Sequence, residues 1–328
     1  VDILAAEGIV IDGELKAQAA PLAGAEGGQL SLALDTNIRN VTVDANNLLP
    51  GVGLEKFSFD ARDIVVVDAL GKRLADDASF GDAIDSNLQG LAYLDVAEAE
   101  ASGFDTIKLK TDHIATGGLS AASEIRFESD VEISVDNSVV LSAPVINSND
   151  HDVQIDAAYV SLGSDSRSRN SVATTPTKGV QDFTVSAGLV DIVGDVEITG
   201  TERVSINASD DIRFIGAQTA QTIEQLTGSL TAATDIKLSS GQLYPASFTK
   251  AEINIVNDSD GVVTITGNGN RAPVLSALGS LTINAPVIDH GGVIKAPLGN
   301  IEFNASEKIT LKPGSVTSVS AEGQSIPF

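Results

Sequence analysis

The sequence predicts an all-β fold in which short strands stack into a parallel β-helix. Three observations predict it: a short strand motif recurs along the chain, turn residues follow the strands closely, and the apolar residues are almost all aliphatic. The chain has 328 residues with no Cys, Met or Trp and only 10 Phe and 3 Tyr, although 42% of it is hydrophobic. Stacked columns of Val, Ile, Leu and Ala suit the interior of such a repeat fold.

A five-residue motif (apolar, any, apolar, Asn or Asp, Ala) occurs six times. Its copies are residues 41–45, 57–61, 153–157, 204–208, 281–285 and 301–305. The alternation within each copy predicts a strand with one buried face. The last two copies start 20 residues apart, which fits one coil of a β-helix. We expect the Ala at the corners of the coil, and we expect the outward Asn or Asp to hydrogen-bond its neighbour or the turn backbone.

Further strand-like segments follow or resemble these copies. They are residues 124–127, 211–214, 235–238 and 308–311. Gly, Asn, Asp and Ser separate the strands so frequently that we expect no helix between them. The spacing predicts about 11–13 coils and a shaft of roughly 55–60 Å.

The alternative fold is an all-β sandwich, which also has short alternating strands. The repeat spacing, the shortage of aromatic residues and the scarcity of Asn-Gly or Asp-Gly hairpin turns argue against it. We expect a single domain, residues 1–328, with loop insertions near 72–89, 163–179 and 218–227. The first of these loops is expected to hold a short helical turn, and residues 220–226 have some helix potential.

Composition and charge exclude several classes of function. The formal net charge is −25, from 45 acidic and 20 basic side chains, which disfavours nucleic acid and anionic membrane surfaces as partners. The absence of Cys excludes disulfides, thiol catalysis and Cys-ligated metals. No apolar run approaches the ~18 residues of a membrane span. The chain begins at Val1 without Met or a visible signal peptide, so we expect an internal or processed piece of a longer protein.

Few residues suggest chemistry, and we expect no catalytic, cofactor or metal site. His151 lies in a polar cluster that could bind a metal, but a solvated loop is the preferred interpretation; His290 is expected in a turn and His113 at the surface. Residues 257–261 (Asn-Asp-Ser-Asp-Gly) resemble part of a calcium loop. They lack the remaining ligands, so we expect a turn between strands.

Adjacent carboxylates and glycosylation sequons are also interpreted as structural. The pairs Asp76–Asp77 and Asp210–Asp211 could serve a polysaccharide-cleaving enzyme, but adjacent residues of a strand face opposite ways. Asn-X-Ser/Thr sequons occur at Asn40, Asn207, Asn257 and Asn304.

The C-terminal third carries a resemblance to a known family. Residues 275–286, 291–301, 311–320 and 323–328 resemble the filamentous haemagglutinin family, and residues 28–35, 103–109 and 139–145 agree with it. These proteins are very large exoproteins of Gram-negative bacteria, exported through the outer membrane by a dedicated pore-forming partner. The resemblance implies a right-handed β-helix shaft of a surface-exposed or released adhesin. The family's amino-terminal secretion domain, with its Asn-Pro-Asn signature, has no match in this sequence.

The leading functional expectation is a structural and adhesive shaft segment without catalytic activity, secreted or held at the bacterial surface. Its partners would be the outer-membrane transporter of the parent protein and an unidentified ligand on a cell or matrix. The alternatives are a polysaccharide lyase or hydrolase built on the same fold, and the delivery shaft of a contact-dependent toxin.

Overall fold

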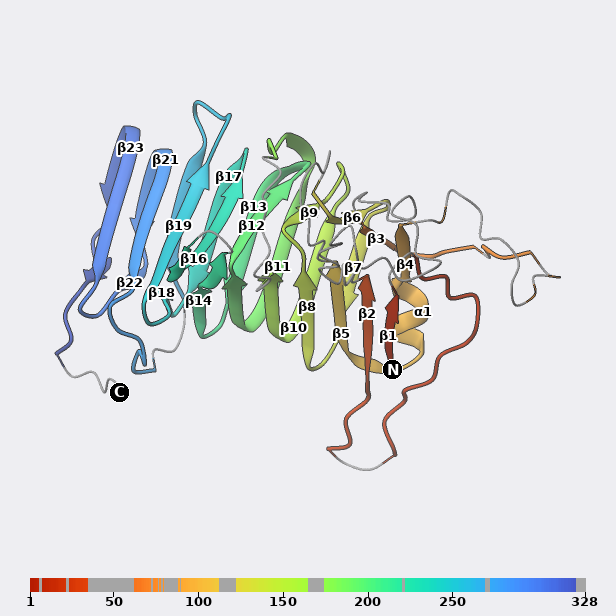
Figure 1. The fold of residues 1–328 in the computed structure, drawn as a ribbon. Helices are drawn as coiled ribbons and strands as arrows, with labels where there is room; N and C mark the ends of the chain where they lie inside the picture. Colours follow the sequence, from red (N-terminus) through yellow and green to blue (C-terminus); the bar gives the residue numbers. More distant parts are fainter. Residues whose placement is uncertain are drawn as a thin grey trace, which may run out of the picture.

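The computed structural model describes most of the chain and shows one stack of parallel strands. The described residues are 1–5, 8–21, 24–34, 62–71, 73–75, 77, 79, 88, 90–111, 122–164, 174–219, 222–268 and 272–322. Within them the strands succeed one another along a shaft whose N-terminal and C-terminal coils lie at opposite ends (Figure 1). The prediction of a parallel β-helix is confirmed.

The strands form three stacks, named here faces A, B and C, and each regular coil visits them in the order C, B, A. Face A contains β1 (Asp2–Ala5), β2 (Gly28–Leu34), β5 (Phe104–Thr111), β8 (Ser138–Ser142), the second parts of β10 (Val153–Gly163) and β11 (Lys178–Val193), β14 (Asp211–Ile215), β18 (Gln242–Pro245), β22 (Val293–Lys295) and β24 (Val316–Ser318).

Face B contains β7 (Val131–Ser134), the first parts of β10 and β11, β13 (Thr201–Ala208), β17 (Asp235–Ser240), β20 (Val262–Gly267) and the second parts of β21 (Ser280–Gly291) and β23 (Asn300–Leu311). Face C contains β4 (Leu91–Asp95), β3 (Asp63–Val67), β6 (Glu124–Phe127), β9 (Val145–Asn147), β12 (Asp195–Thr199), β16 (Thr222–Ala232), β19 (Thr249–Ile255) and the first parts of β21 and β23.

The core consists of columns in which equivalent residues of successive coils lie on one another. One column of face B runs through Val131, Val153, Phe183, Val204, Ile236, Val263, Ile288 and Ile309. All of these except Ile309 are buried. Because parallel pairing repeats the same register from coil to coil, an apolar position in one coil extends the column of the next. The absence of Met and Trp is therefore compatible with a continuous core.

The motif copies that the structure describes form strands with the predicted alternation. Residues 153–157, 204–208, 281–285 and 301–305 lie in β10, β13, β21 and β23, whereas copies 41–45 and 57–61 lie outside the described residues. Ala157, Ala208 and Ala285 are buried. The pairing of β21 with β23 shifts register between Ala285 and Val287, where the strand passes from face C to face B. Ala285 therefore occupies the corner between faces C and B, and Ala157 and Ala208 end the face B strands at the corner with face A, so small residues lie at corners as predicted.

The predicted side-chain ladder of the motif is also present. The side-chain amide of Asn304 donates to Oδ1 of Asn284 at 3.0 Å, and the amide of Asn284 donates to Oδ1 of Asn254 at 2.7 Å. Asn254 donates in turn to Thr231 at 3.5 Å. Asn207 instead donates to the backbone carbonyl of Val185. The outward Asn residues thus link neighbouring coils in parallel with the backbone ladder.

Face A holds ten stacked strands among the described residues, fewer than the expected number of coils. The chain between β2 and β5, which are neighbours in this face, runs from residue 35 to residue 103. This long connection includes β3 and β4, which pair in reverse of their sequence order, so that β4 lies nearer the N-terminal end. The residues of this connection contribute no strand to face A, so the number of coils is lower than the chain length predicted.

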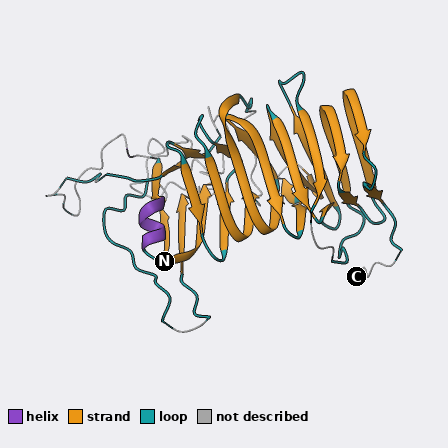
Figure 2. Cartoon of the chain, turned by 180° about the vertical axis from the view of Figure 1, so that it is seen from behind, coloured by secondary structure: helices purple, strands orange, loops and turns teal. Residues whose placement is uncertain are grey.

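One helix contradicts the expectation that no helix interrupts the strands. Helix α1 (Val96–Ala101) begins after Asp95, whose side chain accepts a hydrogen bond from the backbone of Glu98 and caps the helix. It buries Val96 and Ala99 and lies at the N-terminal end of the shaft (Figure 2). The side chain of Glu100 accepts from the backbone N–H of Ser134, so α1 covers the outer edge of β7. Among the described residues, no helix has the length and apolarity to cross a membrane.

The three predicted loops had different outcomes. Only residues 73–75, 77, 79 and 88 of segment 72–89 are described, and residues 165–173 of segment 163–179 lie outside the described residues. The helix potential near 220–226 was a wrong interpretation. β15 (Ala217–Thr219) and β16 form an antiparallel hairpin, because residues 226–232 already belong to face C and pair with β19, which draws the preceding residues into extended structure.

Replacement of a core aromatic tests the column packing. Phe183 is fully buried and meets Phe127 edge-on, with ring centroids 6.4 Å apart. We expect Phe183→Ala to lower the free energy of unfolding by about 3–5 kcal/mol, because it leaves a cavity that neighbouring coils cannot fill. Urea denaturation followed by circular dichroism measures this loss. The matched control Phe248→Ala, at a mostly exposed Phe, should change stability by no more than about 0.5 kcal/mol.

Candidate functional site

The C-terminal coil presents an apolar surface that no described residue covers. We name it the end surface; it consists of the inward-facing side chains of β23, which are Ile301, Phe303, Ala305, Ile309 and Leu311. Ile309 is 45% exposed and Leu311 57% exposed, whereas their column partners Ile288 and His290 in β21 are fully buried. Positions that belong to the core in every earlier coil are therefore open to solvent here.

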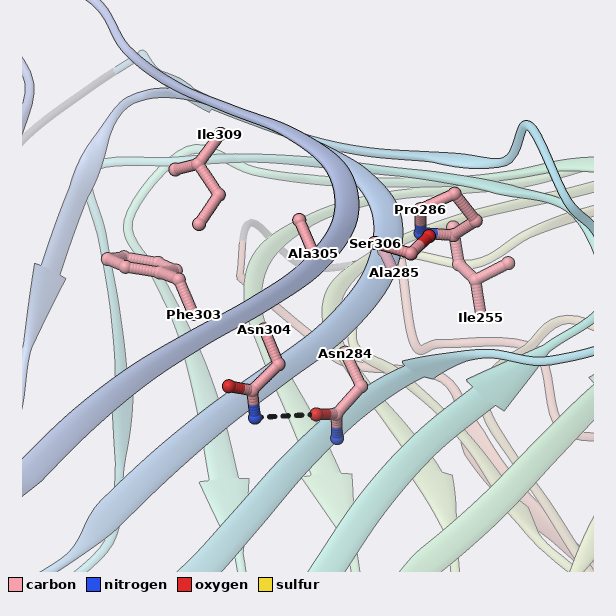
Figure 3. A pocket seen from close by; sticks show the side chains of 9 residues that line it. All are labelled: Ile255, Asn284, Ala285, Pro286, Phe303, Asn304, Ala305, Ser306 and Ile309. Atoms are coloured by element: carbon pink, nitrogen blue, oxygen red, sulfur yellow. Dashed lines mark hydrogen bonds between the residues drawn. The ribbon is translucent and has the colours of Figure 1, made fainter.

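A hollow of about 510 Å³ lies at the corner of this coil (Figure 3). It is lined by Ile255, Asn284, Ala285, Pro286, Phe303, Asn304, Ala305, Ser306 and Ile309. Phe303, Ala305 and Ile309 supply apolar surface, while the bonded amides of Asn304 and Asn284 lie on the outer side of the ribbon. Such a hollow suits apolar side chains and an adjoining amide partner.

The backbone of β23 is equally open. β23 pairs with β21 on one side, and no described strand pairs with its other side. An edge strand of this kind presents a row of N–H and C=O groups that favours addition of another strand. Apolar surface and backbone edge occur together, so this is where a further strand or coil can add to the described stack.

A second candidate is a polar cluster on the outside of face A. Asp191 is buried, and both of its carboxylate oxygens are bound by Arg213, at 2.6 and 2.7 Å. The hydroxyl of Tyr159 donates to Asp191 at 2.9 Å. In the coils beyond, the hydroxyl of Tyr244 donates to Asp211 at 3.1 Å. Asp191, Arg213 and Tyr244 occupy equivalent positions in three successive coils.

Burial governs the protonation of this cluster. Burial, followed by the charge of Asp191, raises the pKa of Tyr159 to about 12, and burial likewise raises the pKa of Tyr244. Burial also raises the pKa of Asp211. The hydrogen bonds from Arg213 to Asp191 raise the pKa of the guanidinium, which stays charged. Arg213 is thus held in its charged form by its two hydrogen bonds to Asp191, which suits bracing between coils better than proton transfer.

The limited solvent access of the Asp191 and Asp211 carboxylates also favours a structural role for this cluster. A lyase or hydrolase needs a carboxylate or base that reaches a bound sugar. Both oxygens of Asp191 accept hydrogen bonds from Arg213 or Tyr159, and Oδ1 of Asp211 is buried without a hydrogen-bond partner in the part of the chain that the structure describes. Neither carboxylate presents a free oxygen to solvent.

A third cluster lies on the outside of face C. Arg126 pairs with Glu124 at 2.8 Å, with Glu128 at 3.2 Å and with Asp63 at 3.5 Å. Burial raises the pKa of Asp63 to about 6, and the neighbouring charge of Glu124 adds to this rise. One arginine thus holds three carboxylates from two adjacent coils. No group of three or more His and acidic side chains within the described residues has an arrangement that could hold a metal ion.

The histidines differ from expectation in one case. His290 is not in a turn; it lies in β21, fully buried in the core column that contains Ile265 and Leu311. Its Nε2 contacts the carbonyl of Val316 at 3.3 Å, and its Nδ1 has no hydrogen-bond partner among the described residues. The sequence Asp-His-Gly-Gly resembled a turn, but β21 continues through Gly291. His151 lies in a loop beside Asp130, at 3.4 Å, and His113 lies outside the described residues.

The remaining predicted residues are structural where they are described. Residues 257–261 connect β19 and β20, as expected, and Asp258 pairs with Lys178 at 3.6 Å. Asp210 is exposed in the bend before β14, whereas Asp211 is buried at the first position of that strand, so the two carboxylates lie in different environments. Asn207 and Asn304 make the hydrogen bonds given above. Asp76 and Asn40 lie outside the described residues.

The sequence interpretation missed the cluster around Asp191 and Arg213. The two residues are 22 positions apart, close to one coil length, and both occupy outward positions of a strand. An acidic and a basic residue separated by one coil length, both at outward strand positions, could have predicted this contact.

Comparison with known proteins adds no identification. No protein-family model matches this chain, and neither a curated protein nor a solved structure matches it.

The buried histidine generates a pH-dependent prediction. Burial lowers the pKa of His290 below its usual 6.5, so the unfolded state binds more protons than the folded state when the pH falls below about 6.5. His290 therefore costs stability increasingly as pH falls. We expect His290→Leu to raise the free energy of unfolding by about 1–2 kcal/mol at pH 7.5, by removing an unpaired buried nitrogen, and by more at pH 5.5.

Urea denaturation at both pH values measures this difference. Ile265→Val, at the neighbouring position of the same core column, is the matched control; it neither adds nor removes a titratable group, so its effect on stability should be the same at both pH values. A His290→Leu gain that shrinks at pH 5.5 would contradict the inference.

Proposed function

We propose that this chain is a non-catalytic shaft segment of a large secreted bacterial exoprotein of the filamentous haemagglutinin type. In this role it is exported through an outer-membrane transporter partner and presents loops or a distal tip to cells or matrix. The single observation that carries the proposal is the unbroken column structure of the core. Each coil supports the next, and the buried polar clusters of faces A and C brace coils to one another.

The mode of assembly supports secretion as an extended chain. Contacts in a β-helix are made between neighbouring coils, so a coil can fold once the one before it is in place. From β5 to β24 most described strands pair in parallel with both the coil before and the coil after. The exceptions are β7, β23 and β24, which pair on one side, and β15, which forms a hairpin with β16. A chain of this kind can fold progressively as it emerges from a transporter. The net charge of −25 keeps such shafts apart laterally.

Adhesion assays test the proposal. Beads coated with the 328-residue chain should bind saturably to epithelial cells, to bacteria or to matrix proteins, and beads coated with the heat-unfolded chain should not. Beads carrying an unrelated acidic protein of similar net charge control for electrostatic adsorption. Binding equal to that control on every surface would contradict the adhesive role.

A second candidate, a polysaccharide lyase or hydrolase, has one observation in its favour. Asp211 combines a raised pKa with a tyrosine partner and stands beside Arg213, a grouping found in acid–base sites. The buried carboxylate oxygens favour the structural role instead. We therefore expect no turnover of a panel of acidic glycans, followed by ultraviolet absorbance for lyase products and by reducing-end release for hydrolysis.

The variants decide between the two roles of this cluster. Arg213→Gln should lower the free energy of unfolding by about 3 kcal/mol, because it removes the only charged partner that the described residues give to the buried Asp191, and should change no glycan turnover. The exposed ion pair of Arg203 with Asp182 provides the control: Arg203→Gln should cost less than about 1 kcal/mol. Glycan turnover that is lost in Asp211→Asn while the fold remains intact would overturn the structural assignment.

A further inference from the structure

We propose that a row of exposed apolar side chains on the flank of the shaft is a self-association site, at which two copies of this chain pack side by side in antiparallel orientation. The row consists of Phe248, Leu278 and Leu298 and is named here the corner ridge. These residues lie in the turns that lead into the face C strands β19, β21 and β23. The inference goes beyond the proposed function, since it holds whether or not the shaft is adhesive.

Backbone hydrogen bonds stack the three turns of the corner ridge on one another. The N–H of Phe248 donates to the carbonyl of Ala277 at 3.1 Å, and the N–H of Leu278 donates to the carbonyl of Pro297 at 2.9 Å. The N–H of Leu298 makes the same contact with the turn that follows β24, at 3.0 Å. Each ridge residue therefore has a further described coil on its C-terminal side, so its side chain is exposed laterally, on the flank of the shaft.

The backbone at these three positions is left-handed, which is unusual for such side chains. The φ angle is 61° at Phe248, 61° at Leu278 and 58° at Leu298. Every other described residue with positive φ is Gly, Asn or Asp, which tolerate this conformation. At the corner between β11 and β12 the chain uses Gly194, with φ 59°. A Phe or Leu in the left-handed region costs folding free energy that a Gly does not.

Burial does not compensate this cost within one molecule. Phe248 is 66% exposed, Leu278 50% and Leu298 52%, whereas the residues beside them in the turns are mostly buried. A side chain that is both strained and exposed contributes little to the folding of its own chain. Strained backbone and clustered exposed apolar residues are both typical of binding surfaces. The corner ridge therefore has the properties of a contact surface.

The charge distribution favours a second copy of the chain as the occupant. Residues 239–249, 272–288 and 296–301, which contain the ridge and its turns, have no charged side chain. The nearest charged side chains of β19, Lys250 and Glu252, pair with each other at 3.7 Å. The net charge of −25 therefore lies elsewhere, and it repels a copy that approaches through another surface. At this corner the second copy offers an apolar, uncharged row with the same coil spacing.

A hairpin at the same corner favours the antiparallel orientation. β15 and β16 form this hairpin between faces A and C, one coil nearer the N-terminal end than Phe248. In a parallel pair the two hairpins would meet at equal height and hold the ridges apart. A two-fold axis through Leu278 instead places the hairpins at opposite ends of the contact. Phe248 of one copy then packs beside Leu298 of the second copy, and Leu278 packs beside its own counterpart.

The size of the corner ridge predicts a weak dimer. Three side chains provide less than the roughly 800 Å² that each partner contributes to a standard interface. Repulsion between the two acidic shafts also opposes association at low ionic strength, and added salt screens this repulsion. We therefore expect a dissociation constant in the micromolar range or above, which falls as the salt concentration rises.

Mass measurement tests the association. Analytical ultracentrifugation of the full chain, at concentrations up to about 1 mM, should show a dimer of twice 33.7 kDa. The dimer population should increase with protein concentration and with sodium chloride. A chain that stays monomeric over this range, or an association that weakens as salt rises, overturns the proposal.

Substitution by asparagine separates association from folding. Asn tolerates the left-handed backbone and removes the apolar side chain. Phe248→Asn, Leu278→Asn and Leu298→Asn should therefore each raise the dimer dissociation constant at least about tenfold. The midpoint of urea unfolding, measured at concentrations where the chain is monomeric, should not fall. Val180→Asn, at a residue of β11 that is 67% exposed, is the control and should leave the dimer unchanged.

Two results of this series would contradict the inference. A lower urea midpoint in the three ridge variants would mean that the ridge stabilises the single chain. An assembly that persists in Leu278→Asn would place the interface elsewhere.

Disulfide trapping tests the orientation. The natural chain has no Cys, so each substitution introduces a single thiol. Mild oxidation should convert Leu278→Cys to a covalent dimer, and it should crosslink Phe248→Cys to Leu298→Cys in an equimolar mixture. Phe248→Cys alone should remain largely uncrosslinked, because coils about 4.8 Å apart place its two thiols beyond the ~7 Å reach of a disulfide. Efficient trapping of Phe248→Cys by itself indicates parallel shafts and refutes the antiparallel arrangement.

Discussion

The structure depends on parallel strand pairing in register along the shaft axis. Because β13 pairs with β17, and β17 with β20, through the same alternation, equivalent side chains lie directly on one another in successive coils. The register thereby determines three things together: the apolar columns inside, the Asn ladder beside the corner, and the contact of Arg213 with Asp191 outside. A residue in this molecule is stabilised chiefly by its counterparts one coil before and one coil after.

This constraint makes the two ends of the shaft different from its middle. Interior coils have partners on both sides, but a terminal coil exposes one backbone edge and one side of every column. At the N-terminal end, α1 covers the edge of β7 with a capped helix that uses Val96 and Ala99 as its apolar face. At the C-terminal end, β23 has the sequence of an interior strand, including the Asn of the ladder, and no described element covers it.

The sequence was sufficient to predict the coil but not its exceptions. Period-two alternation with Asn and Ala at fixed places specified β10, β13, β21 and β23, since strand and corner both depend on a few adjacent residues. Helix α1 was not predicted because six residues are too few to show the periodicity of a helix. Asp95, which is a favourable N-cap residue, was the only indication of it in the sequence. The core position of His290 was missed because a polar residue beside two glycines resembles a turn. Its burial follows from its stacking between Ile265 and Leu311, which only the register reveals.

The same register explains why polar clusters in this chain are poor evidence for catalysis. The pairing register brings outward residues one coil apart within hydrogen-bond distance, whatever their role. Opposite charges at this spacing therefore form ion pairs between coils without any need for a catalytic function. Asp191 shows the outcome: its carboxylate is buried, bound twice by Arg213 and once by Tyr159, and cannot turn toward a substrate without losing these bonds. A catalytic carboxylate on such a shaft would need an outward neighbour that leaves one oxygen free. The described clusters on faces A and C instead engage their acids in contacts with arginine or tyrosine.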